Sequence, residues 1–238
     1  MKNSFFLAFF VFSFFLFSCK ERKHTPKVIY ESPALEQAES SVKTTEYQIA
    51  DLPIAFENVN FLIHPVGQIR VTENNKYSSK TTENFSYTMS NFLDYEIQGM
   101  FDNLLFQDKT KDTLIAVSNR KLLISRVNFL NDYFLKVNQQ VFLYEVYDQD
   151  SNKDGLIDGG DIKALFISDD MGKNFKKISI DRHELIDWQF IISTDRLYFR
   201  TVEDINKNGR FDSTDSIHYY YINVKDKTYS PITYNPIQ

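Results

Sequence analysis

Twelve residues near the middle of the chain read Asp150-Ser151-Asn152-Lys153-Asp154-Gly155-Leu156-Ile157-Asp158-Gly159-Gly160-Asp161. Acidic or amide side chains stand at positions 1, 3, 5, 9 and 12 of this stretch, and a glycine stands at position 6. The same spacing recurs in Asp204-Ile205-Asn206-Lys207-Asn208-Gly209-Arg210-Phe211-Asp212-Ser213-Thr214-Asp215. Two matches in one chain indicate a repeated structural unit, so the rest of the sequence is best aligned outward from these two stretches.

Both stretches have the chemistry of a calcium-binding loop. Ca²⁺ takes six to eight oxygen ligands, which such a loop supplies from positions 1, 3, 5, 9 and 12 and from the carbonyl at position 7, and glycine at position 6 permits the sharp turn. We therefore predict Ca²⁺ as the cofactor. The predicted ligands are Asp150, Asn152, Asp154, Leu156 through its carbonyl, Asp158 and Asp161 in the first loop, and Asp204, Asn206, Asn208, Arg210 through its carbonyl, Asp212 and Asp215 in the second.

The two loops differ in charge. The first has four carboxylates, whereas the second has three and the amide of Asn208 at position 5, so we expect tighter binding in the first loop. The alternative is a pair of ordinary turns, because Asn, Asp and Gly favour turns without any ion. An ordinary turn does not need a row of acidic and amide side chains, and packing like charges together is unfavourable unless a cation offsets it.

Each loop ends in Asp (Asp161 or Asp215), where a calmodulin-like EF-hand loop has Glu. In this form the loops resemble those of dockerin modules and of the aspartate-rich type 3 repeats of thrombospondin, which bind calcium outside the cell. The resemblance covers only the loops. Dockerins place a helix after the loop, whereas residues 163–168 and 217–223 are β-branched and aromatic, which favours strands.

The flanks of the loops indicate tandem four-stranded units, so we predict an all-β fold of antiparallel meanders. In each unit the loop joins the second strand to the third. The units resemble the blades of TolB-like and WD40-like β-propellers, with about three blades where propellers have four to eight, which implies an open or incomplete array. The expected strands are 122–129, 141–147, 164–168 and 175–179, then 186–192, 197–202, 218–222 and 229–233, with a degenerate first unit from 61–67, 85–89 and 104–118.

The first residues predict export and lipidation. Residues 1–18 combine an early lysine with an apolar run, which is the form of a secretory signal peptide. Leu16-Phe17-Ser18-Cys19 resembles the lipobox of bacterial lipoproteins, which implies a lipid on Cys19 and attachment to a membrane. Cys19 is the only cysteine, so no disulfide forms within the chain. The alternative is an ordinary signal peptide with an incidental cysteine.

These features divide the chain into three parts. We expect a signal peptide at 1–18, a lipidated cysteine with a flexible tether at 19–50, and a calcium-binding, propeller-like domain at 51–238. The expected location is the envelope of a Gram-negative bacterium, at the outer membrane.

No catalytic motif stands out. The histidines at 24, 64, 183 and 218 have no metal-ligand spacing, so we interpret each as a surface or packed residue. No nucleophile elbow, P-loop or dinucleotide fingerprint occurs, which argues against nucleotides. The net charge of −5, without a basic stripe, argues against nucleic acid. Asp181, Glu184 and Asp187 near Trp188 could form a glycosidase-like acid pair, but a polar connection leading into a strand is the simpler interpretation.

The sequence therefore favours a binding or scaffold module for an envelope protein or glycan over an enzyme. A calcium-dependent hydrolase or carbohydrate-active enzyme, whose site cannot be assembled from the sequence, is the alternative.

Overall fold

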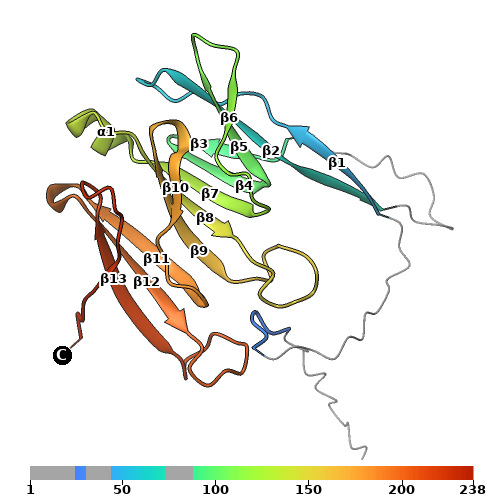
Figure 1. The fold of residues 1–238 in the computed structure, drawn as a ribbon, viewed down its shortest axis with the longest axis vertical. Coiled ribbons are helices and arrows are strands. Elements are labelled where there is room, and N and C mark those ends of the chain that lie inside the picture. The colour runs from blue at the N-terminus through green and yellow to red at the C-terminus, as the bar shows by residue number, and fades with distance from the viewer. Residues whose placement is uncertain (1–24, 31–43, 73–87, 238) are drawn as a thin grey trace, which may run out of the picture.

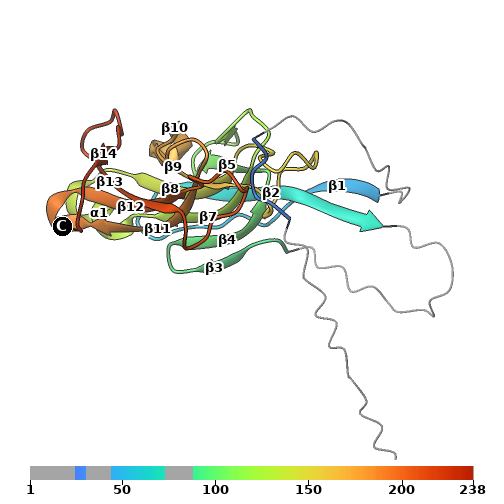
Figure 2. The same ribbon diagram turned by 90° about the horizontal axis from the view of Figure 1, so that it is seen from below.

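The computed structural model describes residues 25–30, 44–72 and 88–237. These residues form three antiparallel sheets of four to six strands, with 47% of residues in strands and 7% in helices (Figures 1 and 2). The predicted all-β class is confirmed.

The first sheet has the strand order β1-β2-β5-β6. β1 (Thr44–Ala50) pairs along its full length with β2 (Phe61–Thr72), and β5 (Asn103–Asp108) and β6 (Leu114–Ala116) follow. Figure 2 shows β1 and the end of β2 extending beyond the other strands. β1 lies within the range that we expected to be tether, so the sheet begins before the domain boundary expected at residue 51.

The middle sheet has six strands in the order β10-β9-β8-β7-β4-β3. The strands β8 and β9 are buried almost throughout, because the other two sheets cover both faces of this sheet. Such double burial explains their nearly continuous apolar sequence. The strands are β3 (Asn91–Leu93), β4 (Glu96–Phe101), β7 (Leu123–Phe129), β8 (Val141–Tyr147), β9 (Lys163–Asp169) and β10 (Lys173–Lys177), with helix α1 (Asn131–Val137) between β7 and β8 and the short turn η1 (Asp170–Gly172) between β9 and β10.

The last sheet is a meander in chain order. It contains β11 (His183–Ile191), β12 (Arg196–Glu203), β13 (Ser216–Asn223) and β14 (Ile232–Thr233), with the turn η2 (Ile192–Thr194) after β11. Buried and more exposed residues alternate along most of β12, as expected of a sheet with one covered face.

The sheets pack as layers with the middle sheet in the centre (Figure 1). Neighbouring residues of β8 show this directly. Phe142 belongs to the core shared with the first sheet, where it contacts Phe61 and Phe106. Leu143 belongs to the core shared with the last sheet, which includes Phe199. Successive side chains of a strand point to opposite faces, so one strand serves both cores.

The second and third predicted units are confirmed as meanders, because β7 to β10 and β11 to β14 each pair in chain order. The first unit is wrong in part. Residues 88 and 89 are in no strand, and 85–87 lie outside the described residues. β1 takes a place in the first sheet instead, while β3 and β4 join the middle sheet at β7. The described sheets form no closed barrel or propeller.

Candidate metal sites

The first loop connects β8 to β9, and its side chains bend its own backbone. Position 1 accepts hydrogen bonds from the backbone N–H groups of positions 5 and 6, and position 3 also accepts from position 5. Position 5 accepts from position 7, position 9 from position 11, and position 12 from position 9. The acceptors are Asp150, Asn152, Asp154, Asp158 and Asp161, at 2.7 to 3.1 Å.

The second loop connects β12 to β13 and repeats this set bond for bond. Its acceptors are Asp204, Asn206, Asn208, Asp212 and Asp215, again at 2.7 to 3.1 Å. The backbone bends agree as well. Position 4 has φ of 58° at Lys153 and 57° at Lys207, and position 6 has φ of 89° at Gly155 and 78° at Gly209. The two sequences therefore build the same local structure.

The loops differ at position 12. Asp161 is fully buried, and its Oδ1 accepts from the N–H groups of Ser151 and Asn152 at 2.7 and 3.2 Å. In the second loop the Oδ1 atom of Asp215 is buried but has no hydrogen-bond partner in the described part of the chain. Position 1 differs too, because Asp204 is buried and Asp150 is only half-buried. The last acid of the second loop therefore has fewer hydrogen-bond donors than the last acid of the first loop.

Residues 25–30, which we call the bridging segment, contact both loops (Figure 1). The N–H of Lys27 donates to the carbonyl of Gly209 at 2.7 Å, and the carbonyl of Lys27 accepts from Ser151 Oγ at 2.6 Å. The N–H of Ile29 donates to the carbonyl of Ser151 at 2.9 Å. Val28 between them is buried. A segment that we expected to be tether therefore ties the two loops together.

The end of the bridging segment also touches the second loop. Tyr30 Oη donates to the carbonyl of Asp204 at 3.4 Å. Burial, and then the neighbouring Asp204, raise the pKa of Tyr30 to about 12. The phenol therefore stays a neutral donor at physiological pH.

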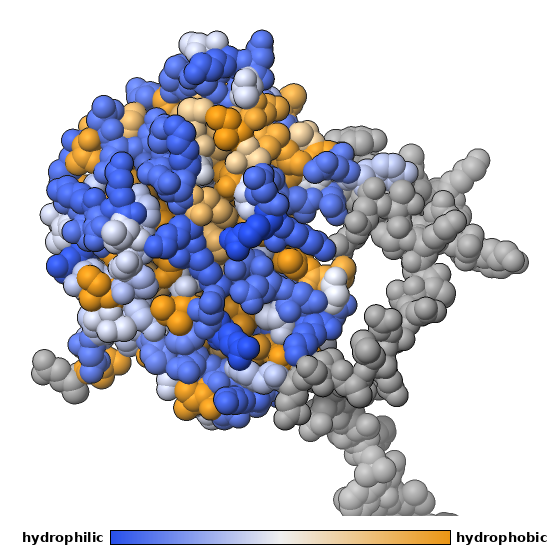
Figure 3. Space-filling model, viewed as in Figure 1, coloured by the Kyte–Doolittle hydropathy of each residue, from blue (hydrophilic) through white to orange (hydrophobic). Residues whose placement is uncertain are grey.

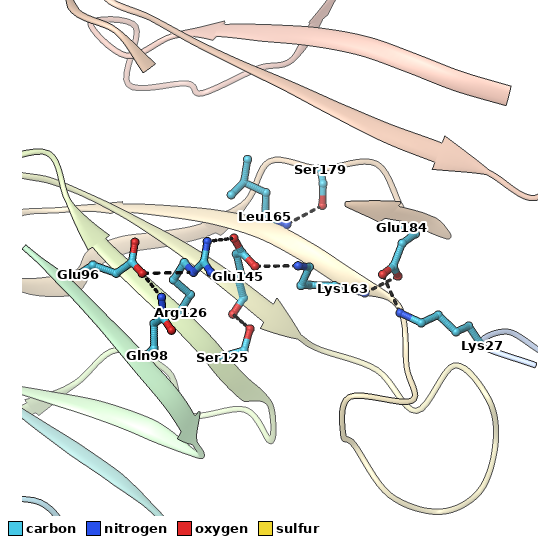
Figure 4. Close-up of polar contacts among 10 residues, drawn as sticks. All are labelled: Lys27, Glu96, Gln98, Ser125, Arg126, Glu145, Lys163, Leu165, Ser179 and Glu184. Atoms are coloured by element: carbon cyan, nitrogen blue, oxygen red, sulfur yellow. Dashed lines mark hydrogen bonds and ion pairs between the residues drawn. The ribbon is translucent and has the colours of Figure 1, made fainter. Parts of the chain in front are cut away.

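A row of alternating charges crosses the middle sheet and ends at the bridging segment (Figure 4). Lys163 Nζ lies 2.8 Å from Glu145, and its backbone N–H donates to Glu184 at 2.9 Å. Glu184 in turn accepts from Lys27 Nζ at 2.7 Å. Glu184 therefore fastens the bridging segment to the sheets. The complete row is Glu96, Arg126, Glu145, Lys163, Glu184 and Lys27.

The other two acids near Trp188 also have their own cations. Asp181 pairs with Lys177 at 2.8 Å, and Asp187 pairs with Arg200. The hydrogen bonds from these cations lower the pKa of each carboxyl group, which is opposite to what a general acid at neutral pH requires. Trp188 packs against the core of the last sheet. This geometry does not favour a glycosidase-like acid pair.

A cluster that sequence analysis missed joins His183, Glu203 and His218. The ligand atoms of these three side chains all lie within 4.8 Å of one another. Among the described residues, the carboxylates of the two loops do not form such a group. Burial lowers the pKa of His183, His218 lowers it further and Glu203 opposes the change. No spacing motif predicts the cluster, because strand pairing brings the three residues together; the nearest signal is that Glu203 directly precedes the second loop.

The predicted signal peptide at 1–18, Cys19 and His24 lie outside the described residues. None of the helices in the described ranges has the length and hydropathy needed to cross a bilayer.

The chain matches no protein-family model, and comparisons with curated proteins and with solved structures find no similar chain.

Proposed function

We propose that the protein is a lipid-anchored envelope protein whose β domain is stabilised by Ca²⁺ in its two loops and serves as a binding or scaffold module. The observation that supports this most directly is the identical hydrogen-bond set of the two loops. Two sequences that share few residues outside the acidic and glycine positions keep the same bends, which is expected when a common ligand selects those positions.

The donors present fit calcium. Carboxylate, amide and carbonyl oxygens are the ligands that this hard cation prefers, at about 2.3 to 2.6 Å. The backbone N–H groups fix the orientation of the acidic side chains and leave further lone pairs on the same oxygens, so a modest rotation of the side chains would be needed for them to bind one ion. The buried Oδ1 of Asp215 is the strongest single case, because a carboxylate oxygen without a donor is costly unless a cation compensates it.

Calcium would also stabilise the bridging segment. The segment hydrogen-bonds to the backbone of Ser151 in the first loop and of Gly209 in the second. An ion that fixes either loop therefore fixes a surface on which residues 25–30 lie. Ligand binding to the native state stabilises it by RT ln(1 + [L]/Kd), so both loops and the segment would gain together.

The anchor, the location and the partner rest on the sequence. A lipid on Cys19 would place the domain at a membrane of the envelope, and we assign the outer membrane of a Gram-negative bacterium. The face seen in Figure 3 is mostly hydrophilic with interspersed apolar residues, so a protein or glycan partner that binds there would meet a largely polar surface. The two four-stranded meanders also fit our proposal that the units are blade-like, as in an open propeller-type array.

Calorimetric titration of the chelator-stripped protein with CaCl₂ tests the proposal. We expect one or two equivalents of Ca²⁺ to bind. Asp154→Asn with Asp158→Asn retains the Oδ1 atoms that accept from the backbone N–H groups of Leu156 and Gly160 but removes two charges, so it should abolish binding there without unfolding the turn. Glu57→Gln is the matched control, because Glu57 is an exposed acid outside both loops. Absence of calcium binding to the parent protein would refute the proposal.

A further inference from the structure

We propose that His183, Glu203 and His218 form a second kind of metal site, which binds a divalent transition-metal ion and fits Zn²⁺ best. The site uses none of the twelve predicted calcium ligands, so it does not depend on the proposed function. Two imidazole nitrogens and one carboxylate are a donor set that zinc accepts with three protein ligands and one open position. Calcium prefers oxygen donors, which separates the two kinds of site chemically.

Strand register brings the three side chains to one place. His183 begins β11 and pairs with Glu203, the last residue of β12. His218 on β13 pairs with Thr201, which lies two residues before Glu203. Residues two apart on a strand point to the same face, as do directly paired residues. All three candidate ligands therefore project from the inward face of the last sheet, where Thr201 and Phe199 are buried.

The distances suit a small ion. His218 Nε2 lies 2.8 Å and His183 Nε2 lies 3.9 Å from Glu203 Oε2. Ligand atoms at about 2.0 to 2.1 Å from a tetrahedral zinc ion are roughly 3.3 Å apart. The two observed separations lie on either side of this value, so rotations of exposed side-chain ends would complete the site without moving the strands.

The orientation of His183 also favours metal binding. Its Nδ1 lies 3.0 Å from the hydroxyl of Thr201, which is fully buried. When Nδ1 carries the proton and donates it to this hydroxyl, Nε2 presents a lone pair toward Glu203. A metal-binding histidine commonly has such an outer partner, which fixes its ring and tautomer.

One side of the cluster is open. His183 is buried, whereas the side chains of His218 and Glu203 are 34% and 45% exposed. This leaves access for the ion and room for water as a fourth ligand. Glu203 directly precedes Asp204, so a bound ion would clamp the ends of β11, β12 and β13 where the second loop begins.

The test is Co²⁺ and Zn²⁺ binding to the full chain in excess CaCl₂, which occupies the calcium loops. The parent should carry Cys19→Ser and His24→Gln, because these residues lie outside the described part and cysteine and histidine are side chain types that bind zinc. We expect one equivalent of Co²⁺ to give the visible absorption of a tetrahedral site, and one equivalent of Zn²⁺ to displace it.

Variants assign the site. Loss of an outer partner typically weakens metal binding about 10- to 100-fold, so Thr201→Val should fall in that range and loss of a ligand in His218→Gln or Glu203→Gln should cost at least about 100-fold. His64→Gln is the matched control. His64 is also a half-buried strand histidine, but its Nε2 contacts the amide oxygen of Gln107 at 2.9 Å. Circular dichroism should show that each variant is folded.

Two results would overturn the proposal. The first is the absence of saturable Zn²⁺ binding to the parent in excess CaCl₂. The second is binding that survives both His218→Gln and Glu203→Gln, which would place the ion elsewhere. His218 and Glu203 are partly exposed, so these variants remain informative even if replacement of the buried His183 prevents folding. Calcium binding that persists in the same variants would leave the proposed function intact.

Discussion

The two loops have the same hydrogen-bond skeleton but satisfy their last acid differently. Asp161 accepts from several donors of the first loop, whereas one buried oxygen of Asp215 has no partner in the described part of the chain. The residue at position 2 is one reason for this difference. In the first loop, the N–H of Ser151 donates to Asp161 Oδ1, and the hydroxyl of Ser151 lies 3.2 Å from the same oxygen. In the second loop, position 2 is Ile205, which has no hydroxyl. The first loop therefore gives hydrogen-bond donors to both oxygens of its last acid, whereas the second gives a donor to only one of them in the described part of the chain.

The largest effect should come from removing the satisfied acid. Asp161→Ala leaves three part-buried backbone N–H groups without an acceptor, those of Ser151, Asn152 and Asp158. An unsatisfied donor costs about 1 to 3 kcal/mol when it is fully buried and less when water reaches it. We expect a loss of about 3 kcal/mol in the free energy of unfolding, measured by urea denaturation without calcium. Asp215→Ala should cost clearly less under the same conditions, because only the N–H of Asp212 loses its acceptor and the other oxygen had no partner in the described part of the chain. Equal losses would show that the two positions are energetically alike.

Calcium itself should have the next largest effect. At a free concentration of 100 Kd, each filled loop gains about 2.7 kcal/mol, which corresponds to a rise of about 5 to 10 °C in Tm for a domain of this size. Chelation should lower Tm accordingly, and added CaCl₂ alone should restore it. We expect the calcium affinities of the two loops to lie within about tenfold of each other. The first loop has one more carboxylate, which favours binding there, whereas the second loop has an Asp215 oxygen without a hydrogen-bond donor in the described part of the chain, which favours binding there. A gap of several hundredfold would mean that charge alone sets affinity.

The two glycines at position 6 sharpen the comparison. Both have positive φ, so alanine at either costs about 1 kcal/mol in backbone strain. An added Cβ at Gly155 meets nothing within 4 Å, but at Gly209 it would lie 2.6 Å from the carbonyl oxygen of Val28. Gly209→Ala should therefore cost about 2 kcal/mol or more, since the bridging segment must also move. Thermal melts of the two variants, with Gly155→Ala as the control, measure the difference.

Exchange of the residues at position 5 should have the smallest effect. Asp154→Asn weakens the first loop and Asn208→Asp strengthens the second, while Oδ1 still accepts from position 7 in each. Calorimetry should show that the affinities shift in opposite directions, by about 1 kcal/mol each. Unchanged affinities would show that the side chain at position 5 does not contribute to calcium binding in either loop.

Local patterns in the sequence were sufficient for the loops and for the two meanders that contain them. Acidic spacing and short apolar runs are local properties, and β7 to β14 follow them in chain order. The first sheet could not be predicted in the same way. β1 pairs with β2 across the connection at 51–60, and β3 and β4 belong to the middle sheet, where β4 pairs with β7. Strand propensity does not specify the partner of a strand.

Two features of the candidate sites could not be predicted for a related reason. The contacts of residues 25–30 with Ser151 and Gly209 cross more than a hundred positions of sequence. The meeting of His183 with His218 depends on the exact pairing of β12 with both of its neighbours. The polar composition of residues 20–50 predicts a flexible tether. The burial of Val28 follows from its packing in the folded domain, which composition does not encode.

The bridging segment limits how far the domain can stand from a bilayer. Only six chain steps separate Cys19 from Thr25, and six residues span at most about 20 Å even when fully extended. If a lipid on Cys19 inserts into a leaflet, the end of the domain that contains the two loops lies close to the lipid surface, because residues 25–30 contact both loops. Anionic phosphates and acidic loops would then face each other across a narrow gap, where shared divalent ions favour close approach and their removal favours repulsion.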